Sequence, residues 1–597
     1  MDVSKRFDIQ VEAIPCATKG THMTTHRWRA VAAATAALLA TTALTAPAAV
    51  AGGGHHHPDR PAKHRSAERV VAQMQPGWNL GNSFDAVGAD ETAWGNPVVT
   101  REQIAAVADE GFRSIRIPVT WGQHEGPAPE YTIDPAFLDR VQEVVDWALE
   151  EDLYVLLNVH HDSWMWTNAL PSDPEGVTAQ FDATWEQIAA RFADHPAELT
   201  FESLNEPQFA GVDDAAGDTL LHDLNVSFHE IVRAAGGNND DRLLVLPTLH
   251  TNAGQERLDA LDATITQLDD PDVAATIHYY GYWPFSVNVA GGYRYDDVAR
   301  EDMTGTFDRV QDTFVDAGVP VILGEYGLLG FDRHTGTIEQ GEKLKFFEMF
   351  GAEAREAGVT TMLWDNGQHL DRTTFRWQDK ELFTQIRSSW RTRSGTASTD
   401  QVFVRPGAVE AQTITLQPHG TKFLGLWQGR RPLMPVLDYR VEGDEVTLTK
   451  RLLKRLTDDD HGTAAELTAL FSRGVPWDVE IVVADTPGLT DATGTTDDFG
   501  IPTAFNGDRL ATMEAVYADG TGAGPHSWTT YKEFDAAFVP DEEAGEIVLR
   551  PAFFAEVRDG EAVHLTFHFW SGDTVEYTVT KEGGTVTGTV TETVSAD

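Results

Sequence analysis

Eight short apolar segments, separated by amphipathic ones, limit most strongly how this chain can fold. Between about residues 70 and 392 they read PGWNLGN, FRSIRIPVTW, LYVLLNVHHD, LTFESLNEP, RLLVLPTLH, VAATIHYYGY, VPVILGEYG and VTTMLWDNG. Each is almost continuously apolar, as expected for a parallel strand that is buried on both faces. The segments between them have helical periodicity, so the pattern predicts a (β/α)8 TIM barrel. A doubly wound open sheet is the alternative, but no Gly-rich phosphate turn follows any of the segments.

Polar or aromatic residues stand at the ends of these predicted strands. They are Asn82, Arg116, His160, Glu206, His250, His278 with Tyr280, Glu325 and Trp364. The carboxyl ends of barrel strands meet at one mouth, which is where barrel enzymes carry their active sites. We therefore expect these side chains to converge on a single site.

The pattern changes after about residue 393 to β alternation without intervening helices, except for one possible helix within KRLLKRLTDDDHGTAAELTALFSRG. Residues 400–488 read as a small β-sandwich, and residues 489–597 as a second β-rich unit. The fold class is thus α/β, a TIM barrel over 70–392 followed by two small all-β sandwich domains.

The N-terminal region reads as an export signal. Residues 23–51 combine a short basic segment, an apolar Ala/Thr-rich run and a small-residue cleavage site, so we expect a signal peptide and a secreted, extracellular protein. Residues 1–22 fit no part of a signal, and translation is expected to begin at Met23. The only cysteine, Cys16, precedes the cleavage point. Residues 52–69 are a linker whose histidines, His55–His57, read as a leader remnant rather than a metal site.

The charge balance limits the class of partner. Lys and Arg number 45 against 93 Asp and Glu, a net charge of −48, which argues against nucleic acid or an anionic membrane as a partner. The 16 tryptophans suit carbohydrate, because the flat apolar face of an indole matches a pyranose ring. We expect a polysaccharide partner and a monomer.

Two carboxylates, Glu206 and Glu325, follow the fourth and seventh predicted strands and can face each other across the mouth. Glycoside hydrolysis needs such a pair, and the distance between the carboxyl groups decides between retention and inversion. Arg116 and Tyr280 are expected near Glu325, where a cation and a phenol favour the carboxylate form of a nucleophile. Glu206 follows an apolar strand, and desolvation there is expected to raise its pKa, as an acid requires.

Other residues near the mouth are expected to contact the sugar. Asn205 can bond the 2-hydroxyl of the ring, and Trp364 can form a flat floor beneath it. Six further tryptophans either line the cleft or pack under loops: Trp78, Trp94, Trp121, Trp164, Trp166 and Trp283.

The segments GWNLGNSFDA, ETAWGNP, RIPVTW, LNVHHD, ESLNEP, IHYYGY, GEYG and LWDNG resemble, in this order, glycoside hydrolase family 5. They look most like its subfamily 4 of endoglucanases and xyloglucanases. The resemblance implies a retaining mechanism with Glu206 as acid/base and Glu325 as nucleophile, and no cofactor. Arg116, His160, Asn205, His278, Tyr280 and Trp364 match the remaining active-site positions, and His161 resembles a subsite residue. Asn82 and Trp94 are further expected substrate contacts. A metal site at HHD is disfavoured, because no further ligand follows at helical spacing.

The two β-rich units resemble an immunoglobulin-like spacer and a family 46 carbohydrate-binding module. The second resemblance rests on the segments HSWTTYKEF and HLTFHFWSGDTVEYTV. Trp528 and Trp570 are its expected sugar contacts, although Trp570 equally fits a core position in a strand. Trp427 and Trp477 of the spacer are expected in its core.

These observations predict a secreted, retaining endo-β-1,4-glucanase that acts on cellulose, xyloglucan or mixed-linkage glucan. One alternative keeps the barrel but makes it a β-mannanase or a transglycosylase. Another is a non-catalytic polysaccharide-binding protein, which the intact pair of glutamates disfavours.

Overall fold

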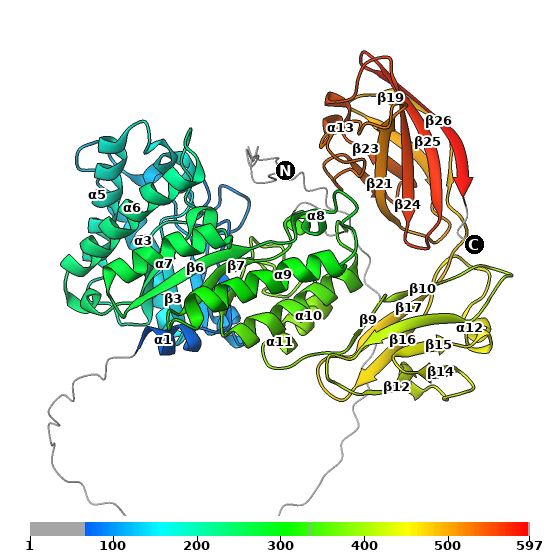
Figure 1. The fold of residues 1–597 in the computed structure, drawn as a ribbon, viewed down its shortest axis with the longest axis horizontal. Coiled ribbons are helices and arrows are strands. Elements are labelled where there is room, and N and C mark those ends of the chain that lie inside the picture. The colour runs from blue at the N-terminus through cyan, green and yellow to red at the C-terminus, as the bar shows by residue number, and fades with distance from the viewer. Residues whose placement is uncertain (1–65, 333–335, 595–597) are drawn as a thin grey trace, which may run out of the picture. The chain divides into compact units, whose positions relative to one another are not determined.

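The computed structural model describes residues 66–332 and 336–594 (Figure 1). The predicted upstream extension 1–22, the signal peptide 23–51 and all but the last residues of the 52–69 linker lie outside the described residues, and so does Cys16. Among the described residues, no helix is both long enough and apolar enough to cross a membrane.

The eight predicted strands form a closed parallel barrel, which confirms the fold class. They are β1 (Gly77–Asn79), β2 (Ser114–Ile117), β3 (Tyr154–Asn158), β4 (Leu199–Glu202), β5 (Leu244–Pro247), β6 (Val273–Tyr279), β7 (Val321–Tyr326) and β8 (Thr360–Leu363). The barrel closes where Gly77 of β1 pairs with Met362 of β8. A Cβ at Gly77 would lie 2.5 Å from the Met362 Cγ, so this closure requires a glycine.

Helices cover the barrel strands on the outside. The longer ones are α2 (Arg101–Asp109), α3 (Pro135–Glu150), α5 (Pro174–Arg191), α6 (Asp214–Ala234), α7 (Gln255–Leu268), α9 (Asp297–Val310), α10 (Gln340–Ala357) and α11 (Lys380–Ser389). Most begin at a side chain that accepts a hydrogen bond from the first turn; the capping residues include Asp134, Asp213 and Asp379. The short helix α1 (Ala67–Gln73) packs its Val70 and Val71 in one cluster with residues of β3, β5, β6, β7 and β8.

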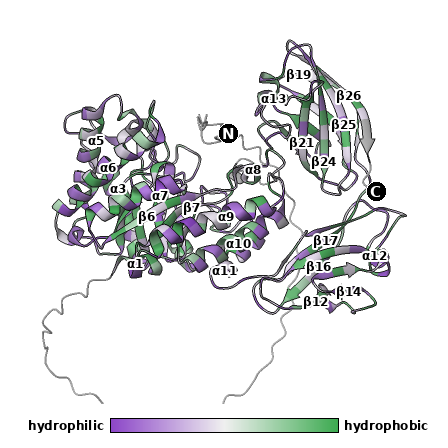
Figure 2. Cartoon of the chain, in the orientation of Figure 1, coloured by the Kyte–Doolittle hydropathy of each residue, from purple (hydrophilic) through white to green (hydrophobic). Residues whose placement is uncertain are grey.

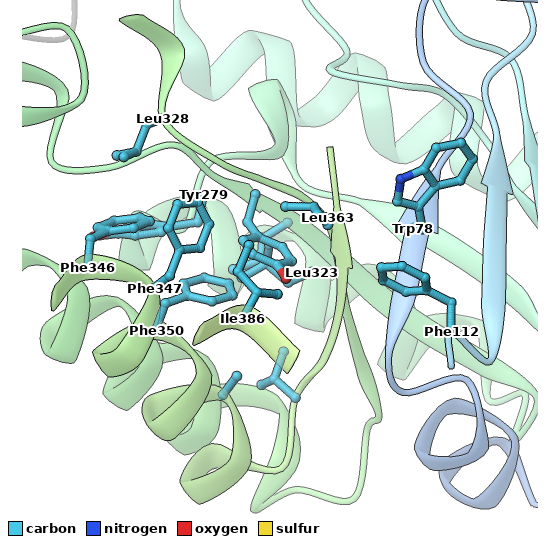
Figure 3. Close-up of a cluster of buried hydrophobic side chains, with 14 of the residues drawn as sticks. Trp78, Phe112, Tyr279, Leu323, Leu328, Phe346, Phe347, Phe350, Leu363 and Ile386 are labelled. Atoms are coloured by element: carbon cyan, nitrogen blue, oxygen red, sulfur yellow. The ribbon is translucent and has the colours of Figure 1, made fainter. Parts of the chain in front are cut away.

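The barrel core lies between the strands and these helices. Figure 3 shows Phe346, Phe347 and Phe350 of α10 directed at Tyr279 and Leu323 on the neighbouring strands. The Phe350 ring stacks on Tyr326 at 4.2 Å between centroids. In Figure 2 hydrophobic residues gather along strands such as β6, while hydrophilic ones line the outer helices such as α9. Because α10 packs across β6 and β7, it holds in place the strands that carry His278 and Glu325.

Each β-rich unit consists of two sheets. The spacer has the sheets β10-β17-β16-β12-β13 and β14-β15-β11-β9. Its elements are β9 (Thr396–Ala397), β10 (Gln401–Val404), β11 (Gln412–Gln417), β12 (Phe423–Gln428), β13 (Arg431–Pro432), β14 (Tyr439–Glu442), β15 (Glu445–Leu448), α12 (Lys450–Leu456), β16 (Gly462–Phe471) and β17 (Trp477–Val483). Helix α12 is the one expected within this unit. Trp477 is buried, as predicted, whereas Trp427 is half-buried.

The last unit has the sheets β18-β20-β23-β22 and β19-β26-β25-β24-β21. Its elements are β18 (Gly488–Leu489), β19 (Ala492–Thr495), β20 (Phe499–Ala504), β21 (Leu510–Tyr517), β22 (Phe538–Asp541), β23 (Glu546–Leu549), α13 (Pro551–Ala555), β24 (Ala562–Phe569), β25 (Thr574–Glu582) and β26 (Thr585–Val594). Its core is a separate hydrophobic cluster, while the spacer core is continuous with that of the barrel. The barrel, the spacer and the last unit nevertheless belong to one compact unit.

Candidate active site

The mouth of the barrel collects the carboxylates and their partners from five different strands or strand ends. Glu325 lies in β7 and pairs in register with His278 of β6, while Arg116 lies in β2. Glu206 follows β4 on a turn where its own φ is +40°, a left-handed conformation that a side chain adopts at some cost. Strained backbone of this kind clusters at functional sites.

Glu325 is buried and held by two donors. Arg116 Nη1 donates to its Oε1 at 2.6 Å, and the Tyr280 hydroxyl donates to its Oε2 at 2.7 Å. His278 Nδ1 lies 3.6 Å from Oε2, and His160 Nε2 lies 3.9 Å from Oε1. The bonds from a cation and a phenol therefore fix the orientation of both Glu325 oxygens.

Glu206 has a different environment from Glu325. Its side chain is 45% exposed, and its Oε1 lies 3.0 Å from His278 Nδ1. One oxygen of Glu206, one of Glu325 and a nitrogen of His278 all lie within 4.8 Å of one another. The two carboxylates thus face each other across a short gap, with His278 in contact with both.

The pKa of Glu206 is lowered from its ordinary value. Burial acts to raise it, but the hydrogen bond and charge of His278 and the charges of His161 and Arg116 outweigh burial. The expectation of a raised pKa is therefore wrong for this arrangement. The desolvation that the sequence suggested does act on this carboxyl, but nothing in the sequence indicated that His278 would lie next to it.

Sequence reasoning missed the buried carboxylate of Glu202, the last residue of β4. Arg116 donates two hydrogen bonds to this carboxylate, from Nε to Oε2 at 2.6 Å and from Nη2 to Oε1 at 3.0 Å. Both side chains are fully buried. The remaining Arg116 hydrogens go to Glu325, to Asn79 Oδ1 at 2.9 Å and to Asn205 Oδ1 at 2.8 Å. All five donors of the guanidinium are used, which fixes it in one orientation.

This network also sets the charge state and orientation of its members. Burial acts to lower the pKa of Arg116, but Glu202 and Glu325 together raise it, so the guanidinium stays charged. Asn205 accepts from Arg116 through Oδ1, which leaves Nδ2 as the end that can donate to a sugar hydroxyl. A Glu at the last position of β4, three residues before Asn205, was the signal in the sequence.

A second group of predicted residues lies beside His160. Its ring stacks parallel to Trp364 at 6.0 Å and lies 4.5 Å from the ring of His161. Burial, together with the charges of His161, Arg116 and His278, lowers the pKa of His160 well below its usual value, so its ring is neutral. The half-buried Trp94 lies 5.2 Å from His161 on the other side.

Asn82 joins this group through the backbone. Its nitrogen donates to the buried Asp85 at 3.0 Å, its carbonyl accepts from Asn96 at 3.0 Å, and its φ is +55°. His161 Nε2 lies 3.6 Å from Asp85, and His161 Nδ1 accepts from Trp164 Nε1 at 2.9 Å. The predicted residues from the first and third strand ends are thus brought together.

The remaining strand-end residues divide clearly between core and surface. Trp78 and Trp121 are fully buried: Trp78 Nε1 donates to Asp365, and Trp121 Nε1 donates to the Asn158 carbonyl. Trp164 is 43% exposed, and Trp166 and Trp283 are half-buried. His250 is exposed on a turn with a φ of +58°, where its backbone nitrogen donates to the carbonyl of Pro207, the residue after Glu206, at 2.9 Å.

Within residues 66–332 and 336–594, two groups of side chains have donor atoms close enough to hold a metal ion. They are Asp85 with His160 and His161, and Glu206 with His278 and Glu325. Asp162, the aspartate of the HHD segment, accepts instead from the nitrogens of Trp121 and Gly122 and from Trp166 Nε1. It therefore closes a loop at the mouth.

Comparison with known proteins assigns the chain to a family. Residues 79–370 match the model of the cellulase family, glycosyl hydrolase family 5. Endoglucanase B of Paenibacillus lautus is 51% identical over 528 residues, which cover 87% of this chain and 93% of that protein. The chain belongs to glycoside hydrolase family 5. Residues 396–481 match carbohydrate-binding domain X2, and residues 485–589 match the family 46 carbohydrate-binding domain.

Solved structures of family 5 enzymes extend this similarity over all three modules. The tri-modular endo-β-1,4-glucanase B of Bacillus halodurans is 50% identical, with a TM-score of 0.87, and covers 89% of this chain and 100% of its own. A tri-modular subfamily 4 enzyme of Bacillus licheniformis, solved with cellotetraose, is 30% identical, with a TM-score of 0.73, and covers 88% and 100%.

The two tryptophans predicted for the family 46 module lie in different surroundings. Trp528 is 62% exposed, and its ring lies 6.2 Å from that of Trp283 in the family 5 barrel. Trp570 is half-buried beneath Arg294 of the barrel, whose guanidinium carbon lies 4.6 Å from the ring centroid, and it contacts Tyr293 edge-on at 5.6 Å. Trp528 thus has a free face for a ligand, while Trp570 packs at the contact with the barrel.

Proposed function

We propose that this family 5 enzyme is a retaining endo-β-1,4-glucanase. The observation that carries the proposal is the short gap between the two catalytic carboxylates, whose nearest oxygens lie within 4.8 Å of each other. Retaining glycosidases place their carboxyl groups about 5–5.5 Å apart, whereas inverting ones leave about 6.5–9.5 Å for a water molecule. The gap supports direct attack on the anomeric carbon.

The mechanism follows from the partners of each glutamate. Glu325, held by Arg116 and Tyr280, attacks the anomeric carbon, while Glu206 protonates the departing glycosidic oxygen. In the second step Glu206 takes a proton from water, which attacks the glycosyl–Glu325 bond and releases the sugar with retained configuration. His278 lies within contact of both carboxylates and stabilises the charge that moves between them.

The environment of Glu206 suits an acid that becomes active when substrate binds. Its side chain is 45% exposed in the free protein. A pyranose ring over the carboxyl takes away this contact with water, which favours the neutral form and raises its pKa. The bound sugar therefore adds to the desolvation that the protein alone supplies at Glu206.

The substrate class is proposed from the relatives and from the aromatic residues along the mouth. The relatives are named endoglucanase, and one binds cellotetraose. Trp364 stacks on His160, and Trp94 lies against His161. A second aromatic contact joins Trp283, three residues after Tyr280, to Trp528 of the family 46 module. Such a set of rings suits a long β-glucan chain cut internally.

Activity on a panel of soluble polysaccharides tests this proposal. Reducing-sugar release is measured on carboxymethyl cellulose, xyloglucan, mixed-linkage β-glucan, glucomannan and galactomannan. We expect release from the glucans and none from galactomannan, with the β-anomer formed first by proton NMR. Release from galactomannan alone would indicate the β-mannanase, and larger products without net hydrolysis would indicate the transglycosylase. If the folded protein releases no sugar from any of these substrates, the remaining hypothesis is a non-catalytic polysaccharide-binding protein.

Substitution of either glutamate is expected to abolish most turnover without unfolding the protein. Glu325→Gln removes the nucleophile and Glu206→Gln the acid/base, and each is expected to reduce kcat on mixed-linkage glucan by about 1,000-fold or more. Added azide should restore turnover of an activated aryl glycoside by Glu206→Gln as the β-glycosyl azide, since azide needs no general base. Glu353→Gln, on the outer helix α10, is the matched control. Near-normal kcat in either active-site variant would remove that residue from the mechanism.

We also propose that the protein is secreted, on the evidence of residues 23–51 alone. Expression of the full gene should yield a culture-medium protein that begins close after Ala51. Retention of the whole chain inside the cell would overturn this.

A further inference from the structure

The loop that presents Trp528 is built around a buried lysine. This loop, residues 522–531, follows β21 in the family 46 module and is called the Trp528 loop below. Lys532, the residue after it, is fully buried. Its ammonium donates to three carbonyl oxygens of the loop: Thr529 at 2.8 Å, Pro525 at 3.2 Å and His526 at 3.4 Å. All three N–H donors of one side chain are therefore directed at the Trp528 loop.

The backbone of the loop needs such support. His526 has a φ of +56° and Gly524 a φ of +72°, both in the left-handed region. Three carbonyl oxygens that point inward at one place repel one another unless a donor lies between them. Lys532 supplies that donor, and Glu533 fixes the other side of the turn, with its Oε2 2.8 Å from His526 Nε2.

The same loop lies against the family 5 barrel. Trp283 contacts His526 edge-on at 5.6 Å and Trp528 at 6.2 Å. The Phe534 nitrogen donates to the Asn288 carbonyl at 3.1 Å, and the Asn288 side chain donates to the Ala511 carbonyl at 2.9 Å. Trp528 thus contacts Trp283 of the barrel, and the carbonyl of the next residue, Thr529, accepts from the Lys532 ammonium.

Burying an ammonium group beneath a loop costs desolvation free energy, whereas apolar side chains could fill the same space without that cost. Burial lowers the pKa of Lys532 to about 8, and the charge of Glu556, at the end of α13, acts only to raise it. The other titratable groups around the loop, His526 with Glu533 and Glu514 with His568, are paired with each other. The charge of Lys532 is thus directed to the loop carbonyls.

We propose that Lys532 is a positioning residue, which clamps the Trp528 loop so that Trp528 and Trp283 together form one platform for a glucan chain leaving the active site. The inference rests on the proposed function, because it needs a long glucan as substrate. It deepens that function by naming the residue that makes the carbohydrate-binding module act with the barrel. Lys532 itself touches no sugar.

A double-mutant cycle on the full chain tests the clamp. Lys532→Met keeps an unbranched side chain one atom shorter but removes the three donors, and Trp528→Ala removes the platform. We expect each single variant to lower kcat/KM on soluble xyloglucan by about tenfold, and the double variant to lose no more than either single. On an aryl β-cellobioside, too short to reach the platform, all three should stay within about twofold of the wild type.

Lys581→Met is the matched control. Its ammonium donates to the Phe554 carbonyl at 2.9 Å in the same module, and not to a carbonyl of the Trp528 loop. We expect it to keep wild-type activity on both substrates. Circular dichroism and the melting temperature of every variant show whether a loss follows from unfolding instead.

The dependence of activity on pH distinguishes a positioning role of Lys532 from a merely structural one. Lys532 is charged below about pH 8 and neutral above it, so the clamp is complete at low pH and weakened as pH rises through that value. The ratio of wild-type to Trp528→Ala activity on xyloglucan should therefore fall above pH 8. In a Lys532→Met background the same ratio should stay near one at every pH.

Each contrary outcome points to a different failure. If Trp528→Ala leaves xyloglucan activity unchanged, no platform exists and the role of Lys532 falls with it. Trp528→Ala could lower activity on xyloglucan while folded Lys532→Met does not, or the two losses could add in the double variant. Either result would reject the role of Lys532 but leave Trp528 as a contact for the glucan. No hydrolysis of any glucan by the wild type would instead overturn the proposed function.

Discussion

At the scale of single residues, the site is organised by Arg116 rather than by Glu206 or Glu325, the proposed catalytic glutamates. Its guanidinium joins Glu202, Glu325 and Asn205, so one side chain sets the position of the proposed nucleophile and of the proposed 2-hydroxyl ligand. Glu202 offsets the charge of Arg116 and leaves it one fixed orientation. Buried ion pairs of this kind add little net stability but cost several kcal/mol when one partner is removed.

Glu202→Gln is therefore expected to impair catalysis through Arg116. In this variant an amide NH2 replaces one of the two carboxylate oxygens. The Arg116 guanidinium has only donors, so one of its two hydrogen bonds to residue 202 is lost and the guanidinium shifts toward Glu325. We expect kcat on mixed-linkage glucan to fall on the order of 100-fold with KM changed less than about threefold. The free energy of unfolding should fall by about 3–5 kcal/mol. Steady-state kinetics and urea unfolding measure both effects.

Glu202→Asp serves as the conservative control, since it keeps the charge and one of the two bonds. It should recover part of the lost kcat. A folded Glu202→Gln protein with unchanged kcat would show that Arg116 needs no second carboxylate.

At the scale of elements, the first turn of α10 holds a pair of carboxyl groups shared with the spacer. Glu339 caps the helix by accepting from the Glu342 nitrogen at 3.1 Å, and Asp400, just before β10, packs against Gly341. A hydrogen bond joins the two carboxyls. Burial, followed by the charge of Glu339, raises the pKa of Asp400 well above its usual value, and burial likewise raises that of Glu339.

This pair is expected to make stability depend on pH. The folded chain binds a proton here more tightly than the unfolded chain, so the contribution is complete below an ordinary carboxyl pKa of about 4 and is lost as pH rises above it. Asp400→Asn supplies a permanent donor to Glu339. It should raise the melting temperature at pH 8 by about 2–4 °C and make no difference at pH 4.

Calorimetry across pH 4–8 measures this difference, with the exposed Asp444→Asn as control. Equal destabilisation by Asp400→Asn at both pH values would mean that the pair shares no proton.

At the scale of the whole molecule, ion pairs link the spacer to the family 46 module. Arg405, next to β10, bonds the buried Asp573 at 2.5 Å and Thr486 at 3.0 Å. Arg509 of the last module bonds Glu480 of the spacer at 3.0 Å. Because the core of the last module is a cluster of its own, such polar contacts carry much of its coupling to the rest of the chain.

Arg405→Ala is expected to uncouple the melting of the last module. Removal of the cation leaves a buried carboxylate without its charged partner, a loss of about 1–3 kcal/mol. The calorimetric transition should then broaden or split, with the new component at lower temperature. Lys450→Ala, which breaks an exposed ion pair with Glu410, should leave the transition unchanged. A single unshifted peak in Arg405→Ala would show that this contact does not join the modules.

The sequence by itself determined the barrel, the two β-sheet modules and the residues at the mouth. Strands buried on both faces must be continuously apolar, and a polar residue such as Glu325 at the end of such a strand is conspicuous for that reason. The order of the strands then places Glu206 and Glu325 on the same rim, because all parallel strands end there.

Only the tertiary structure decided which partners those residues have. In the sequence, Glu202 is one more polar residue at the end of a strand, and nothing there indicates its ion pair with Arg116. The burial of Trp78 and the exposure of Trp528 could not be distinguished from composition, since an indole fits a core and a sugar surface equally well. Distances between side chains far apart in sequence, including the gap between Glu206 and Glu325, depend on how the loops close. Local sequence does not encode that closure.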